Sequence, residues 1–156
     1  MRRRLTVVSL VFLAAAPAAV FAQYAQKKTL YERLGGYDAI AKIVDDFLPR
    51  LSKDPKIAAM IGGLATTSRM RNRQLIVDQL CNETGGPCLY VGRTMEQAHQ
   101  GLEINDQLWE FSQKALGDSL DASKVGEPER GELLALVEKH RAEIIEKKQA
   151  AAKKPQ

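Results

Sequence analysis

The residue with the clearest chemistry is His99, the single histidine of the stretch Thr84–Ile104. A neutral imidazole at the end of a short helix is a good iron ligand, because its second nitrogen can bond a carbonyl or carboxylate that fixes the tautomer. A lone histidine is also common as an ordinary core or surface residue. The residues around His99 must therefore decide between these two interpretations.

Turn signals and a helix start precede the histidine. The run Gly85-Gly86-Pro87 cannot continue a helix, because two permissive glycines precede a proline that has no amide hydrogen. Thr94 is suited to an N-cap, and Gln97 three residues later completes a capping box. The pattern predicts a loop, then a helix of one or two turns with His99 near its end.

The segment GGPCLYVGRTMEQAHQGLEI, which begins at Gly85, resembles the proximal segment of the group I truncated haemoglobins. These are small bacterial and protist globins. A second segment, LYERLGG from Leu30 to Gly36, resembles the opening segment of that family. The resemblance covers residues 29–147 and implies an all-α fold, a two-over-two helical sandwich.

The resemblance also implies a cofactor and its ligand. His99 takes the place of the proximal ligand of haem iron, Tyr90 that of a tyrosine near a haem propionate, and Met95 and Leu102 pack on the proximal side. The chain has no Cys-x-x-Cys-His run, so we expect non-covalent haem b.

On the distal side the chain departs from the family pattern. Leu48 stands where relatives have a tyrosine that bonds the bound gas, and Met60 and Ile61 stand where a phenylalanine wedges the haem. These aliphatic residues still form an apolar slot. Haem binding is therefore expected to survive, whereas tight retention of oxygen is not.

The register of the distal helix has two alternatives. Counting back from Thr84 without gaps places Asn72 and Ile76 over the iron, which makes Asn72 the only hydrogen-bond donor. If the helix slips by two residues, Met70 and Gln74 take those places instead.

Apolar residues at three- and four-residue spacing predict several amphipathic helices and no strand. The expected helices cover a single turn after Thr29 and the residues 37–51, 54–61, 68–82, 94–99, 106–116 and 128–148, with a loop over 117–128. Pro49 should kink or shorten the last turn of its helix. His140 is expected to be a structural or surface residue and not a ligand.

Two further groups allow two interpretations each. Arg69, Arg71 and Arg73 in the first half of a helix oppose its macrodipole, so they serve an anionic partner or form a solvated face. Cys81 and Cys88 form a disulfide in an oxidising compartment or are two separate core residues, because spacing alone cannot place their Cβ atoms.

The ends of the chain have their own signals. Arg2-Arg3-Arg4 and the apolar run after them predict a signal peptide over 1–22, with an uncleaved anchor as the alternative. We expect residues 23–28 to be a leader, 29–147 the globin domain and 148–156 a disordered basic tail. The protein is thus expected in the periplasm or outside the cell.

Without residues 1–22, Lys and Arg fall to 20 (23 minus 3) against 19 acidic residues. The charge is nearly balanced, and no basic stripe with interleaved aromatics indicates nucleic-acid binding. The 134 remaining residues (156 minus 22) suit one domain with its own core.

Three functions follow from the resemblance. The first is a haem protein that reversibly binds oxygen, nitric oxide or carbon monoxide. The second is oxidation of nitric oxide, which requires a separate electron donor because the chain has no reductase motif. The third is a globin-fold periplasmic protein that no longer uses haem. The sequence does not fix the oligomeric state or the physiological gas.

Overall fold

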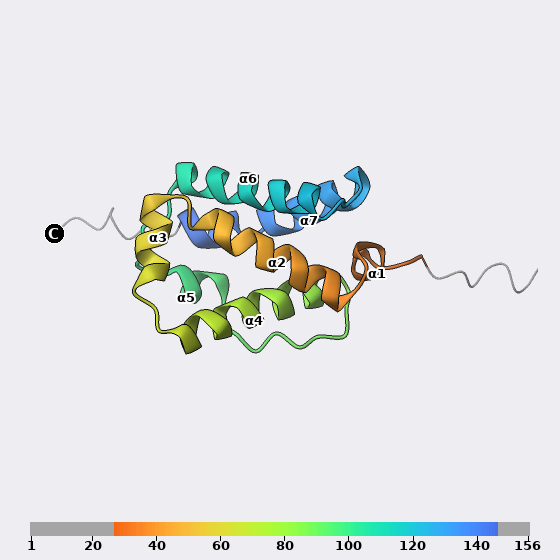
Figure 1. Cartoon of the computed structure of the whole chain (residues 1–156), viewed down its shortest axis with the longest axis horizontal. Coiled ribbons are helices and arrows are strands. Elements are labelled where there is room, and N and C mark those ends of the chain that lie inside the picture. The colour runs from red at the N-terminus through yellow and green to blue at the C-terminus, as the bar shows by residue number, and fades with distance from the viewer. Residues whose placement is uncertain (1–26, 147–156) are drawn as a thin grey trace, which may run out of the picture.

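The computed structural model describes residues 27–146. The expected signal peptide, most of the leader and the basic tail lie outside this range. The helices are α1 (Leu30–Leu34), α2 (Tyr37–Leu51), α3 (Pro55–Gly62), α4 (Thr66–Glu83), α5 (Met95–His99), α6 (Asp106–Ala122), α7 (Glu127–Glu138) and the π-helix η2 (Ala142–Glu146) (Figure 1).

Two helix pairs, α2 with α4 and α6 with α7, build the fold. α2 packs on α4 and also on α6, and α6 packs on α7, so α2 lies between α4 and α6 (Figure 1). No strand occurs in residues 27–146, which confirms the all-α fold class. None of the helices described is long and apolar enough to cross a membrane.

The core forms where these helices face one another. Its fully buried residues recur at helical spacing and come mainly from α2, α4, α6 and α7; they are Ile40, Ile43, Val44, Val77, Cys81, Leu120 and Leu133. Apolar stripes on four helices thus meet in one cluster.

The first helix ties the start of the domain to the end of α4. Thr29 and Glu32 form the expected capping box, with Glu32 N donating to Thr29 Oγ1 (3.2 Å) and Thr29 N donating to Glu32 Oε2 (2.9 Å). Tyr31 N also donates to the carbonyl of Thr84 (2.9 Å), the residue that follows α4.

Two expectations about the later helices are wrong. α6 does not end at Leu116 but runs on to Ala122, and Gly117 is buried inside it. A Cβ at Gly117 would lie 2.8 Å from Arg130 Nη2, so this glycine permits close packing of α6 on α7 and does not end the helix. The last helix also divides, because α7 stops at Glu138 and η2 starts at Ala142.

Pro49 is compatible with the whole of its helix. The expected shortening of α2 does not occur, because the chain is helical from Tyr37 through Leu51. The capping amide of Ser52 still donates to the Leu48 carbonyl (3.2 Å).

Candidate functional site

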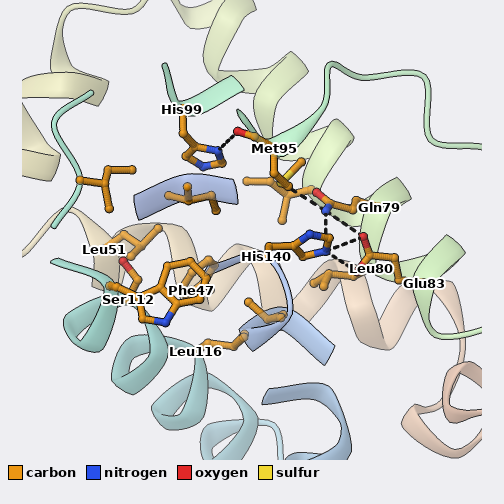
Figure 2. A pocket seen from close by; sticks show the side chains of 15 residues that line it. Phe47, Leu51, Gln79, Leu80, Glu83, Met95, His99, Ser112, Leu116 and His140 are labelled. Carbon is orange, nitrogen blue, oxygen red and sulfur yellow. Dashed lines mark hydrogen bonds and ion pairs between the residues drawn. The ribbon is translucent and has the colours of Figure 1, made fainter. Parts of the chain in front are cut away.

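A cavity of about 210 Å³ lies among α2, α4, α5, α6 and the C-terminal segment (Figure 2). Most of its wall is apolar, formed by Phe47, Leu51, Ile76, Leu80, Met95, Ile104, Trp109, Leu116, Val137 and Ile144. The polar residues of the wall are Gln79, Glu83, His99, Ser112 and His140. The site is therefore a mainly apolar slot with a few polar groups, a pattern typical of cofactor sites.

His99 reaches the cavity from the end of α5. Thr94 caps this helix, with Gln97 N donating to Thr94 Oγ1 (3.3 Å). His99 Nδ1 lies 2.8 Å from the carbonyl oxygen of Met95 (Figure 2). A carbonyl only accepts hydrogen bonds, so Nδ1 carries the hydrogen and Nε2 keeps its lone pair.

The environment favours the neutral form of this imidazole. Burial lowers the pKa of His99, the hydrogen bond to Met95 opposes this, and the charges of His140 and Arg93 lower the pKa further. A neutral imidazole with one nitrogen fixed by a backbone carbonyl is the form that binds a metal.

A second histidine lies in the same wall. His140 Nε2 is 2.9 Å and 3.1 Å from the two carboxylate oxygens of Glu83, and Gln79 Nε2 donates to Glu83 Oε1 (2.9 Å) (Figure 2). The His140 side chain is only 22% exposed and is bonded to Glu83, so of the two expected alternatives the structural residue is the one found. The prediction that His140 is not an iron ligand stays a prediction.

A groove of about 480 Å³ lies between the first half of α4 and the loop before α5. It is lined by Leu64, Ser68, Arg71, Asn72, Leu75, Val91, Gly92 and Arg93. Leu75 belongs to the groove and the next residue, Ile76, to the cavity, so this part of α4 borders both spaces. Residues 65–72 of α4 and its N-cap are all exposed.

A disulfide joins Cys81 at the end of α4 to Cys88 in the loop before α5. The turn between them is close-packed: Gly86 N donates to the Cys81 carbonyl (2.8 Å), and a Cβ at Gly86 would lie 2.5 Å from Tyr31 and 2.7 Å from Cys81 Sγ. Only glycine fits there. Of the two interpretations that the sequence left open, the structure contains the bonded pair.

The structure brings three of the expected site residues together, since Ile76, Met95 and His99 all line the cavity. Asn72 lines the groove instead, and Met70 and Gln74, the slipped alternatives, are both exposed. The remaining five expected residues are half-buried and are not part of the cavity wall; they are Leu48, Met60, Ile61, Tyr90 and Leu102.

Tyr90 braces the loop before α5. Its hydroxyl donates to the carbonyl of Arg93 (2.7 Å), and its ring covers Gly92, where a Cβ would lie 2.3 Å from the hydroxyl oxygen. Burial raises the pKa of Tyr90, the charge of Glu83 adds to this, and Arg93 opposes it. The side chain therefore stays a neutral donor.

Sequence reasoning missed Phe47, Trp109 and the polar group Gln79, Glu83 and His140. Gln79 and Glu83 follow Ile76 by three and seven positions, so helical spacing places all three on one face. That signal was available from the sequence. The approach of His140 was not, because it lies 57 positions beyond Glu83.

Haem, the cofactor that the resemblance implies, fits the chemistry of these residues. His99 offers an unprotonated nitrogen to an apolar slot, and Arg71 and Arg93 line the neighbouring groove, where carboxylates would find cations. The cavity is smaller than the roughly 300–1,000 Å³ of typical ligand pockets. A macrocycle would therefore extend beyond this cavity.

Comparisons with known proteins agree with this fold. The model of the bacterial-like globin family matches residues 29–146. The chain is 32% identical to a group 1 truncated haemoglobin of Nostoc commune over 92 residues, covering 59% of this chain and 75% of the relative. It is 28% identical to one from Mycolicibacterium paratuberculosis over 113 residues, covering 72% and 81%.

Solved structures show the same fold. Truncated haemoglobin from Tetrahymena pyriformis superposes with a TM-score of 0.69 at 24% identity, covering 76% of this chain and 98% of that one. The 2/2 haemoglobin from Synechococcus, described with covalently attached haem, also gives 0.69, at 22% identity and 76% and 99% coverage. The chain thus belongs to the bacterial-like globin family as a group 1 truncated haemoglobin, a family that implies haem-based binding of diatomic gases.

Proposed function

We propose that this chain binds haem b non-covalently, with His99 as the protein ligand of the iron, and that the loaded protein reversibly binds oxygen or another diatomic gas. The observation that carries the proposal is the position of the His99 imidazole, whose Nδ1 lies 2.8 Å from the Met95 carbonyl oxygen while the ring lines a mainly apolar cavity. Bound haem supplies an iron that takes up the gas.

The residues of this chain would each have a separate task. His99 holds the iron, the aliphatic and aromatic wall excludes water, and Arg71 and Arg93 attract the haem carboxylates at the groove. Excluding water matters, because it keeps the site at low polarity and protects a bound gas from solvent. Reduction of the iron requires an electron donor separate from this chain.

The test is the visible absorption spectrum of the purified mature protein, reduced, with and without carbon monoxide. Native protein should show a haem spectrum that carbon monoxide shifts. His99→Ala should lose most of the haem, whereas His140→Ala, which removes the other cavity imidazole, should retain it. A native protein that takes up no added haem, or a His99→Ala variant as fully loaded as the native one, would overturn the proposal.

Extraction with acidified organic solvent tests the non-covalent state. We expect all the haem to leave the polypeptide, because the chain has no attachment motif. Haem that stays with the polypeptide would contradict haem b. Repeating the extraction on His140→Ala would then show whether that cavity residue forms the link.

We also propose that the protein is exported and loses residues 1–22. Support comes from the basic and apolar pattern of that segment and from the Cys81–Cys88 disulfide, which suits an oxidising compartment. Mass spectrometry of periplasmic material should find a chain that starts near Gln23. An intact N-terminus in the membrane fraction would indicate an anchor instead.

A further inference from the structure

A continuous line of contacts leads from the C-terminal segment to the helix that carries His99. It starts at His140, passes through the carboxylate of Glu83 and the amide of Gln79, and ends at Met95. Three separate elements take part: the segment after α7, the last turns of α4, and α5. The contacts lie in the wall of the cavity (Figure 2).

The donors and acceptors of this line can be assigned individually. His140 Nε2 faces both oxygens of Glu83, at 2.9 Å and 3.1 Å, so this nitrogen carries a hydrogen and donates. Gln79 Nε2 has two hydrogens and two acceptors, Glu83 Oε1 at 2.9 Å and Met95 Sδ at 3.4 Å. The 3.5 Å approach of Gln79 Nε2 to His140 Nε2 is then a contact between two donors.

Met95 connects this line to the imidazole. Its sulfur accepts from Gln79, and its carbonyl accepts from Nδ1 of His99 at 2.8 Å. A shift of Met95 therefore moves the acceptor that fixes the ring of His99 and its tautomer.

The helix that carries His99 needs such support. α5 has five residues, which is far too short to be stable by its own hydrogen bonds. In the loop before it, Leu89 is 76% and Val91 71% exposed, so these two side chains give α5 no packing support. Gly101 follows it with a φ of +81°, which makes the exit from the helix a turn. Contacts from other elements must therefore set its position.

We propose that the Glu83–His140 pair positions the His99 imidazole by acting through Gln79 and Met95. The inference rests on the proposed function for the consequence that it draws about haem, but the positioning itself is a property of the protein alone. Glu83, Gln79 and His140 are positioning residues, because none of them needs to touch the iron or the gas.

Two variants test the line at different points. Glu83→Gln removes the negative charge that accepts from His140 and Gln79. Gln79→Met keeps the Glu83–His140 hydrogen bonds and much of the volume but removes both amide donors. The matched control is Asp118→Asn, which removes one negative charge from an exposed i,i+4 pair with Lys114 on α6. If Glu83→Gln does not fold, Gln79→Met still decides the question.

The first readout needs no haem. Nitrogen-15 NMR of the haem-free protein reports which ring nitrogen of His99 carries the hydrogen. We expect the native protein and Asp118→Asn to hold the Nδ1–H form, and Glu83→Gln and Gln79→Met to show a mixture of the two tautomers. An unchanged His99 spectrum in both cavity variants would overturn the proposal.

The second readout uses the haem-loaded protein. We expect haem transfer to apomyoglobin to be about tenfold faster in the two cavity variants, the low end of the effect of removing an outer partner of a metal ligand. The iron–histidine stretching band should shift in these variants and stay in place in Asp118→Asn. If the native chain binds no haem, the proposed function fails, while the NMR result still decides the positioning.

Discussion

At the scale of the residue, the protonation state of His99 matters most, because its imidazole can bind a metal only while it is neutral. In the unfolded chain a histidine has its ordinary pKa of about 6.5. In the folded chain burial lowers the pKa of His99. Below pH 6.5 the unfolded chain therefore takes up a proton that the folded chain resists.

This difference predicts how stability depends on pH. The contribution of His99 to the free energy of unfolding is fully present above about pH 6.5 and falls as the pH drops from there through the lowered pKa, with a slope of at most about 1.4 kcal/mol per pH unit. Urea unfolding of the haem-free protein, repeated at several pH values from about 7.5 to about 5, measures this contribution. His99→Gln should show a shallower slope, and equal slopes would contradict the assignment.

Oxygen release belongs to the same scale. The family resemblance places Leu48 where a phenolic donor is expected, and Asn72 lines the groove and not the cavity. We expect fast release in the native protein and about tenfold slower release in Leu48→Tyr, from one hydrogen bond of about 1.4 kcal/mol. Overpacking of this half-buried site would reduce the gain.

Stopped-flow displacement of oxygen from the reduced proteins measures these rates. Asn72→Ala is the matched control, and we expect it to release oxygen as fast as the native protein does. If Asn72→Ala releases oxygen much faster than the native protein, Asn72 is the working donor and the assignment to an apolar pocket is wrong.

At the scale of the element, α4 divides into two parts. Its first half, residues 66–72, is exposed throughout, whereas Val77, Leu80 and Cys81 of its second half are buried in the core. A helical turn with few buried contacts opens at little cost in free energy. Because the first half also borders the groove, we expect it to be the part that responds to haem.

Hydrogen exchange measured by mass spectrometry tests this expectation. In the haem-free protein the amides of residues 66–72 should exchange quickly, and haem should slow them. The amides of α6 around Leu116 and Leu120, which are buried, serve as the internal control and should exchange slowly in both states. Slow exchange of residues 66–72 without haem would contradict the division of α4.

Local sequence signals predicted the beginnings of helices well. The capping box at Thr29, the bounds of α2 and the start of α3 at Pro55 follow from neighbouring residues, and the structure has them. The ends of α6 and α7 did not follow. In the sequence, Gly117 resembles a helix end. Only the structure shows Arg130 packed against it, which explains a glycine inside the helix. The division after Glu138 coincides with a partner for His140 on a distant helix.

The site was predictable to the same extent. His99, Met95 and Ile76 come from one continuous segment and one helix register, which a single sequence contains. Glu83 and His140 meet only because the chain folds back across the cavity, and no local pattern encodes such a meeting. The sequence left the disulfide undecided for the same reason, since the bond depends on the position of the turn at Gly86.

At the scale of the whole molecule, the disulfide should contribute measurably to stability. It closes a short loop, with a sequence separation of 7, and chain-entropy reasoning gives about 2 kcal/mol for a loop of this size. Urea unfolding of the native protein with and without reductant measures the effect. Cys88→Ala, which spares the fully buried Cys81, should unfold like the reduced protein, and its stability should not respond to reductant.

The same disulfide also changes the effect of a proteolytic cut in the backbone. A protease that cut the turn between Asn82 and Pro87 would separate the residues up to α4 from those that carry His99, if the peptide chain were the only connection. The Cys81–Cys88 bond spans that turn, so the two fragments would remain one molecule until a reductant released them. In the exported protein that we propose, a single proteolytic cut in this turn would therefore damage the chain without dividing the molecule.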